Sequence, residues 1–214
     1  MLIVSGPVLN PRSAKKREQI LEAAGELFAE QGYAISMDAI AVRAKVSKQT
    51  VYAHFKTKDD LFDTCIRAKC TANQLDGSLI DDSSTMREVL CEFAWRFQNM
   101  LMSDEAQHTY KTSVSQADTH PELAQVYLNA GPKTTTDMVA EYLGHNVEKG
   151  VIAIDINLRD AALQLLLMLH GKAVYWKYLG QDSGESDEER RVYLERCVDL
   201  FLKGYNCQEM ASSS

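Results

Sequence analysis

Apolar residues recur at helical spacing through most of this 214-residue chain, and short stretches rich in Gly, Ser and Asp separate the periodic segments. Beyond residue 77, neither a sustained alternation of apolar and polar residues nor a hairpin dipeptide predicts a strand. The pattern therefore predicts an all-α fold.

The N-terminal third of the chain predicts three helices followed by a fourth. Gly32 follows the apolar stripe of the first helix and is suited to end it. Ser36 and Ser47 each precede an apolar helical pattern and can accept hydrogen bonds from its first N–H groups. The T-x-x-D motif that starts at Thr57 predicts a fourth helix over about residues 58–75, which we expect to connect two domains.

Two long helices are predicted near the C-terminus, over residues 158–179 and 187–204. Residues 161–169 are apolar on more than one face, which is typical of a helix covered on both sides. One face can pack on the body of the protein and the other on a second copy, although an ordinary central core helix has the same pattern. Upstream, Gly131-Pro132 is expected to break or kink a helix.

Residues 36–62 contain two short helical patterns hinged at residues 44–46. Each pattern has one apolar face to bury, which leaves the opposite face for a ligand. The second pattern carries Lys48, Gln49 and Thr50 in its first turn, where the recognition helix of a helix-turn-helix meets base edges. Because Lys can reach guanine O6 and N7 and Gln can pair with adenine N6 and N7, the spacing predicts a DNA-reading helix-turn-helix.

These residues resemble the N-terminal signature of the TetR family of transcriptional regulators. Four elements of that signature occur in order: F-x-x-x-G-Y at 28–33, I-A-x-x-A-x-V-S at 40–47, Y-x-H-F at 52–55 and K-x-D-L at 58–61. Lys45 stands where the family usually has Gly. If this residue adopts a positive φ, its side chain costs roughly 1 kcal/mol, which phosphate attraction on the DNA side can offset.

The resemblance implies a three-helix DNA-binding domain, a larger helical domain for ligand binding and dimerisation, and a dimer formed by the last two helices. We expect these parts at residues 12–58 and 77–206, with residues 59–76 as the connecting helix. The predicted contacts of the protein with bases and phosphates are Ser36, Arg43, Lys45, Ser47, Lys48, Gln49, Thr50, Tyr52, His54 and Lys58.

An effector pocket is predicted inside the larger domain, because aromatic and Met side chains form adaptable apolar walls and His or Tyr supplies polar anchors. Residues of these types are also common in ordinary cores. The segment 121–151 weakly resembles the ligand domain of AefR-like repressors. The predicted pocket residues are Phe93, Trp95, Phe97, Met100, Tyr110, Met138, Tyr142, His145 and His170.

The net charge of −7 alone argues against a nucleic-acid partner, but the charge is unevenly distributed. Residues 1–70 carry 11 Lys or Arg and 8 Asp or Glu, whereas the remainder carries 12 and 22, so the basic side chains concentrate at the DNA-reading end. Five cysteines without a C-x-x-C pair are interpreted as packing residues. The apolar N-terminal run is only Leu2-Ile3-Val4 and follows no basic leader, so we expect neither secretion nor a membrane span, and we expect a cytoplasmic protein.

No catalytic motif, glycine-rich phosphate loop or metal-ligand cluster occurs in the sequence, so we expect neither an enzyme nor a cofactor or metal. The expected function is that of a homodimeric repressor, which binds palindromic double-stranded DNA and is released by a small apolar or aromatic effector. An effector-independent structural DNA-binding protein and a transcriptional activator remain the alternatives.

Overall fold

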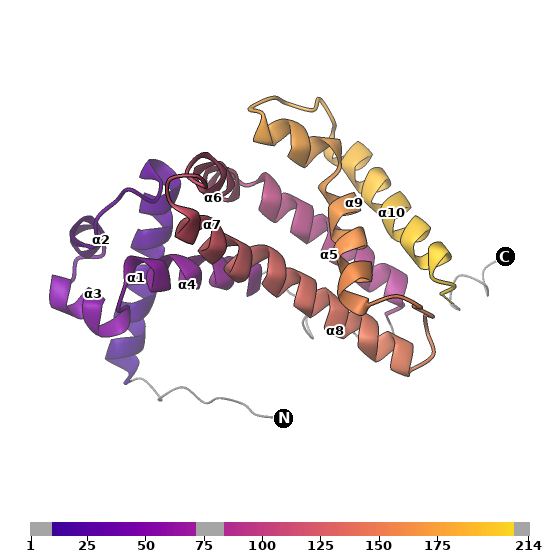
Figure 1. The fold of residues 1–214 in the computed structure, drawn as a ribbon, viewed down its shortest axis with the longest axis horizontal. Coiled ribbons are helices and arrows are strands. Elements are labelled where there is room, and N and C mark those ends of the chain that lie inside the picture. Colours follow the sequence, from indigo (N-terminus) through magenta and orange to yellow (C-terminus); the bar gives the residue numbers. More distant parts are fainter. Residues whose placement is uncertain (1–9, 72–83, 208–214) are drawn as a thin grey trace.

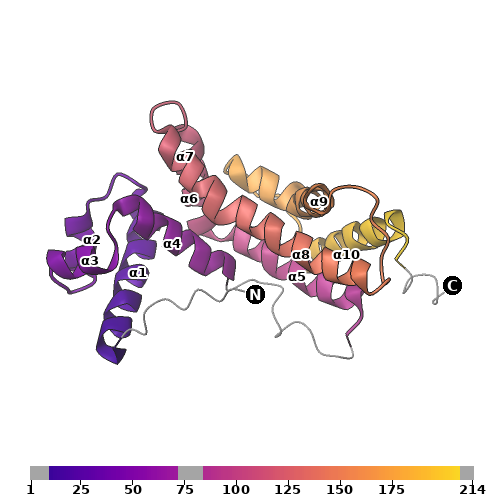
Figure 2. The same cartoon turned by 60° about the horizontal axis from the view of Figure 1, so that its bottom comes forward.

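The computed structural model describes residues 10–71 and 84–207, and within them the chain is all-helical, as predicted (Figure 1). Figures 1 and 2 place α1–α3 at one end and α9–α10 at the other, with α4, α6 and α7 between them. Residues 72–76 of the predicted connecting helix lie outside the described residues. The helices are α1 (Pro11–Gln31), α2 (Met37–Arg43), α3 (Lys48–His54), α4 (Lys58–Thr71), α5 (Met86–Met102), α6 (Asp104–Ser115), α7 (Pro121–Leu128), the π-helical turn η1 (Asn129–Lys133), α8 (Thr134–Glu148), α9 (Leu158–Tyr178) and α10 (Asp187–Gly204).

Local capping sets the ends of the first helices, as the sequence predicts. Gly32 follows α1 with φ 74°, a conformation that glycine adopts at low cost. The Ser36 hydroxyl accepts from the Ala39 N–H at 3.1 Å, and the Ser47 hydroxyl accepts from the Thr50 N–H at 3.1 Å. These bonds satisfy N–H groups that the first turn of a helix leaves without intrahelical partners.

The N-terminal core joins α1–α4 and also takes in a residue of α7. Leu123 of α7 is buried in the same cluster, so α7 helps to complete the core of the DNA-reading end. Full burial of each large apolar side chain contributes about 1.5–3 kcal/mol. The largest fully buried members of this cluster are Ile20, Ile40, Phe55, Leu61 and Leu123.

Of the expected break or kink at Gly131-Pro132, the break does not occur, because α7 continues through the π-helical turn η1 into α8. Proline lacks an N–H and would clash with the carbonyl four residues earlier in a regular α-helix. The wider π-turn accommodates Pro132, and Gly131 is buried within it. The chain therefore changes its helical register here without ending the helix.

Helix α9 bends at Gly171, a feature that the sequence pattern did not predict. Gly171 has φ 59°, and a Cβ on it would lie 2.7 Å from Tyr193 Cε1. Gln98 of α5 donates to the carbonyls of Leu169 and His170 at 3.0 and 3.2 Å. Buried Arg190 in turn donates to Gln98 Oε1 at 2.9 Å. Side chains of α5 and α10 thus hold the bend, where helical hydrogen bonding is interrupted.

Candidate nucleic-acid interface

Helix α3 turns one face into the N-terminal core and the other toward solvent. Val51 is fully buried, and so is Phe55 at the C-terminal end of the helix. Gln49 and Ala53 are exposed on the opposite side, and Tyr52 is 44% exposed. This division matches a recognition helix, whose exposed side chains must reach into a groove of DNA.

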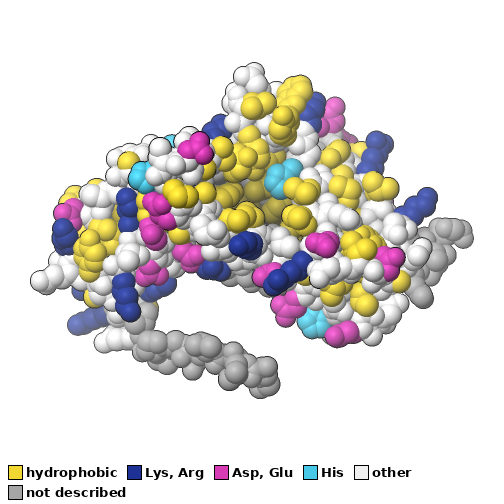
Figure 3. All heavy atoms as spheres, viewed as in Figure 1, with side chains coloured by type: hydrophobic (Ala, Val, Ile, Leu, Met, Phe, Trp, Pro, Cys, Tyr) yellow, Lys and Arg dark blue, Asp and Glu magenta, His cyan; other side chains and the backbone are white. Residues whose placement is uncertain are grey.

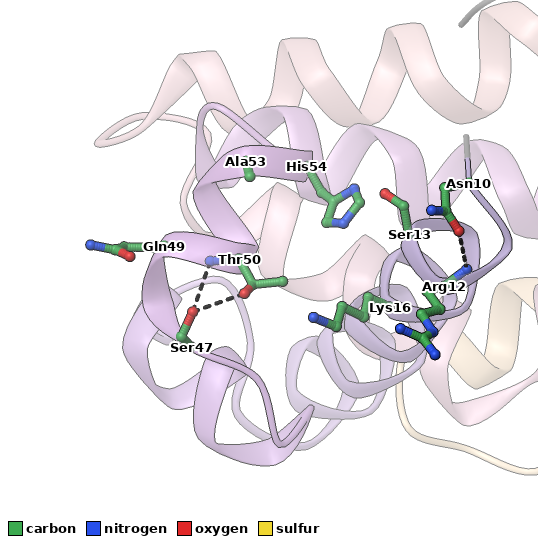
Figure 4. A pocket seen from close by; sticks show the side chains of 9 residues that line it. All are labelled: Asn10, Arg12, Ser13, Lys16, Ser47, Gln49, Thr50, Ala53 and His54. Carbon is green, nitrogen blue, oxygen red and sulfur yellow. Dashed lines mark hydrogen bonds between the residues drawn. The ribbon is translucent and has the colours of Figure 1, made fainter. Parts of the chain in front are cut away.

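A groove of about 420 Å³ runs between the start of α1 and helix α3 (Figure 4). Lys16 extends across it toward Thr50, whereas Gln49 points outward from α3. Arg12 and Lys16 were not among the predicted contacts, although the basic run at residues 12–17 was visible in the sequence. The groove is lined by Asn10, Arg12, Ser13, Lys16, Ser47, Gln49, Thr50, Ala53 and His54.

The predicted base-reading residues differ in how firmly they are held. The Thr50 hydroxyl lies 2.8 Å from the Ser47 hydroxyl, so its position is tied to the helix cap. Lys48 Nζ lies 2.7 Å from Asp38 Oδ1, and this hydrogen bond raises the pKa of Lys48. Gln49 has no hydrogen bond to its side chain within the described residues. Its amide is therefore available to a base edge.

Arg43 and Lys58, two of the predicted phosphate contacts, bind groups of the protein itself in this conformation. The Arg43 guanidinium pairs with Glu30 and Glu26 of α1, each at 2.8 Å, and these hydrogen bonds raise its pKa. Lys58 Nζ donates to the carbonyls of Tyr33 and Ile35 at 2.8 and 3.2 Å. Burial lowers the pKa of Lys58. Both cations therefore hold helices and loops of the domain together in this conformation.

Lys45 adopts φ 55° in the turn between α2 and α3, the conformation expected where the family usually has Gly. Its side chain is exposed. Ser36 caps α2, while His54 lines the groove with its ring 6.4 Å from that of Phe55. The Lys45 side chain is therefore exposed and the His54 side chain is half-buried at the groove.

A chain of aromatic contacts crosses the larger domain. Tyr110 of α6 stacks on Tyr178 of α9 at 3.9 Å between ring centroids, and lies 6.2 Å from Tyr127 of α7. His170 lies 6.5 Å from Tyr178 and 5.8 Å from Phe97 of α5. We call these five residues the aromatic cluster. In Figure 3, hydrophobic side chains surround a hollow over α5, ringed by α6, α7, α8 and α9.

Burial favours the neutral forms of two members of the aromatic cluster, His170 and Tyr178. Burial raises the pKa of Tyr178 to about 12. Burial also lowers the pKa of His170, whose Nδ1 lies 2.8 Å from the Leu166 carbonyl and can donate to it. The cluster therefore offers rings and neutral hydrogen-bonding groups at physiological pH.

The predicted pocket residues do not form a single site. Phe97, Tyr110 and His170 belong to the aromatic cluster, which Tyr127 and Tyr178 complete; the sequence did not single out these last two. Phe93 is fully buried core, and Met100, Met138 and Tyr142 pack against that core. The placement of His145 inside the bundle is wrong, because its side chain is exposed on α8. Trp95 packs against the C-terminal core, and the guanidinium groups of Arg190 and Arg191 lie over its ring at 4.8 and 3.8 Å.

The described part of the chain gives little support to a metal site, a reactive thiol or a membrane-spanning helix. There, no group of three or more His, Cys, Asp or Glu side chains is arranged to hold a metal ion. Burial raises the pKa of Cys91 to about 11 and also raises that of Cys197, so both thiols stay protonated, as packing residues would. None of the described helices is both long and apolar enough to cross a bilayer.

The fold and the exposed face of α3 are those of a helix-turn-helix regulator with a larger helical C-terminal domain. Residues 20–65 match the family model of bacterial regulatory proteins of the tetR family, and residues 88–207 match the C-terminal domain of AefR-like transcriptional repressors. The chain belongs to the TetR family of transcriptional regulators. Regulators of this family bind DNA, and typically form dimers and bind small molecules; they are not enzymes.

Three similar proteins illustrate how far the likeness extends. A TetR-family transcriptional regulator from Mesorhizobium loti has TM-score 0.74 at 26% identity, covering 92% of this chain and 99% of that one. The flavonoid-responsive regulator FrrA has TM-score 0.69 at 31% identity, covering 89% and 97%. The transcriptional activator FasR from Mycolicibacterium smegmatis is 49% identical over 49 residues, which cover 22% of this chain and 22% of FasR.

Proposed function

We propose that the protein is a ligand-responsive transcriptional repressor, which binds an inverted-repeat operator as a homodimer and is released by a small apolar or aromatic effector. The aromatic cluster carries this proposal. It joins α5, α6, α7 and α9, and burial favours the neutral forms of His170 and Tyr178 within it. A planar ligand can stack against these rings and hydrogen-bond to a phenol or an imidazole without a charged partner.

Two similarities support repression rather than activation, and an aromatic ligand. The C-terminal domain resembles that of AefR-like repressors, which favours repression. FrrA is named as flavonoid-responsive, and flavonoids are planar aromatic molecules of the kind the cluster suits. The similarity to the activator FasR covers only 49 residues, about 22% of either chain, so it does not bear on the direction of regulation.

Contacts between α6 and α1 provide a route from the ligand to the DNA. A Cβ on Gly25 would lie 3.3 Å from Glu105 Oε1, and one on Gly32 would lie 3.2 Å from His108 Nε2. Helix α6 therefore packs closely on α1 while Tyr110, on the same helix, belongs to the aromatic cluster. A ligand that separates Tyr110 from Tyr178 would shift α6 and, with it, the DNA-reading end.

Exposed apolar side chains on the last two helices support dimerisation through them. Leu163 and Leu167 of α9 are 45% and 61% exposed, and Leu200 of α10 is 64% exposed. Two copies that pack these faces together would bury them in a four-helix interface. A symmetric dimer presents two recognition helices, which fits half-sites one helical turn or a multiple apart.

The first experiment selects bound fragments from genomic DNA with the full chain and measures operator affinity with and without planar flavonoids. We expect the effector to lower operator affinity by about 1–3 kcal/mol. Calorimetry must then show that saturating operator weakens effector binding by the same factor, because coupling is reciprocal. A ligand whose affinity is unchanged by operator is not the inducer.

A reporter gene placed behind the selected operator separates the remaining alternatives. Repression predicts that deletion of the regulator raises reporter expression and that the effector does the same. Lower expression after deletion would identify an activator. Operator binding that responds to none of a broad panel of apolar and aromatic compounds would favour the effector-independent structural protein.

A further inference from the structure

Lys48, at the first position of recognition helix α3, forms an ion pair with Asp38 in the first turn of α2. The ammonium lies 2.7 Å from Asp38 Oδ1 and 2.9 Å from Oδ2. The two side chains are 59% and 60% exposed, so water surrounds the pair. An ion pair this exposed contributes little to folding stability. Its larger effect is on the charge that the reading surface presents to DNA.

The carboxylate affects phosphates and base edges differently. A phosphate that approaches Lys48 brings a full negative charge close to the negative charge of Asp38. A guanine edge is neutral, and O6 and N7 accept hydrogen bonds without adding a net charge. Because an ammonium has three N–H donors, Lys48 can keep one on Asp38 and direct another to a base. Asp38 therefore disfavours a phosphate contact more strongly than a base contact.

Two other cations at the DNA-reading end, Arg12 and Lys16, differ from Lys48 because they form no ion pair with a carboxylate within the described residues. Arg12 and Lys16 line the groove beside α3, and no carboxylate pairs with either within residues 10–71 and 84–207. These two side chains are free to bind phosphates on DNA of any sequence. Arg43, like Lys48, is masked by carboxylates, in this case Glu26 and Glu30.

We infer that Asp38 is a specificity-determining residue of the DNA-reading surface: its carboxylate masks the Lys48 ammonium against phosphates of non-specific DNA and positions it for a base edge. The inference rests on the proposed DNA contacts of α3. Asp38 acts through Lys48 and is a positioning residue.

The test compares wild type with Asp38→Asn on a random-sequence duplex and on the selected operator, over a series of salt concentrations. Each additional phosphate contact steepens the dependence of log K on log salt by about 0.9. On the random duplex, Asp38→Asn should bind more tightly at low salt and lose roughly 3.5-fold more affinity than wild type between 50 and 200 mM salt. Operator affinity should rise less, so the ratio of specific to non-specific affinity falls.

Two controls assign the effect to the pair. Asp137→Asn removes the same charge from the exposed ion pair with Arg159 at 2.8 Å in the larger domain, and should leave the salt slope unchanged. In a Lys48→Met background, Asp38→Asn should no longer alter the slope. An equal change in Asp137→Asn, or persistence of the effect without Lys48, would overturn the inference.

The remaining outcomes separate this inference from the proposed function. Suppose that wild type binds the operator and that Asp38→Asn keeps the wild-type salt dependence and the wild-type ratio of specific to non-specific affinity. The inference about Asp38 is then wrong, whereas the proposed function as a transcriptional regulator still stands. If wild type binds no duplex at all, both ideas fail. Thermal melting of each variant checks that the fold is intact, which the exposure of the pair leads us to expect.

Discussion

Lys58 links the start of α4 to the loop between α1 and α2. Its ammonium satisfies two backbone carbonyls and lies 4.1 Å from the centre of the Tyr33 ring. Lys58→Met should therefore lower the free energy of unfolding by about 1–3 kcal/mol, because it leaves partly buried carbonyls without donors. Urea denaturation measures the loss, and Lys56→Met, on an exposed neighbouring lysine, is the matched control.

The same variant also tests whether Lys58 binds phosphate. Because the ammonium is held by the Tyr33 and Ile35 carbonyls, the salt dependence of DNA binding should stay close to that of wild type. A slope reduced by about 0.9 would show instead that Lys58 leaves the carbonyls to contact a phosphate.

His170 makes folding stability depend on pH. Burial lowers its pKa below 6.5 in the folded protein, so the unfolded chain binds more protons between that lowered value and 6.5. The stability due to neutral His170 is therefore fully present above pH 6.5 and is lost as the pH falls toward the folded-state pKa. The melting temperature should drop less between pH 7.5 and 5.5 in His170→Gln than in wild type; equal drops would contradict this assignment.

Local signals predicted individual residues well, and contacts between distant residues escaped prediction. Ser36 and Ser47 could be assigned as caps because a cap involves only the next three residues. The partners of Arg43 and Lys58 lie 13 to 25 residues away in sequence, so their positions depend on how the helices pack. The contacts of Arg190 and Arg191 with the Trp95 ring were missed for the same reason, since helical spacing does not reveal which side α10 covers.

At the scale of single elements, the bend of α9 is open to a direct test. Gly171→Ala adds a Cβ at φ 59° and ψ −173°, a conformation adopted essentially by glycine alone, and 2.7 Å from Tyr193. It should therefore lower the free energy of unfolding by more than the roughly 1–3 kcal/mol that the backbone conformation costs alone. Gly180→Ala is the control, because its φ is 72° and a Cβ there meets nothing within 4 Å.

Chemical denaturation compares the two glycine variants. Equal losses in stability would show that Tyr193 moves aside without cost and that only the backbone conformation matters. The apolar pattern correctly predicted a long helix over residues 158–179, but periodicity does not record a bend. Gly171 lies among residues with the same helical spacing, and its conformation depends on Gln98 and Tyr193 from other helices.

At the scale of the whole molecule, the exposed apolar face of α9 and α10 should control assembly and hence DNA binding. Leu167→Glu places a charge on that face, whereas Val114→Glu places one at a similarly exposed apolar site on α6. We expect sedimentation at micromolar concentration to give a dimer for wild type and Val114→Glu, and a monomer with weakened operator binding for Leu167→Glu. A wild-type monomer that binds a single half-site tightly would contradict the dimer.

The continuous helical segment formed by α7, η1 and α8 contributes to two hydrophobic cores. Leu123 packs in the N-terminal core, and Val139 and Leu143 pack in the C-terminal core. A π-turn holds one residue more than an α-turn, and each residue of an α-helix turns the chain by about 100°. Because the additional residue is taken up within the wider turn, the two apolar faces still point at their own cores. Deleting one residue from 129–133 would instead place Pro132 in a regular α-turn, where its ring clashes with the carbonyl four residues earlier. During divergence, the length of this segment should therefore change together with the loss of Pro132.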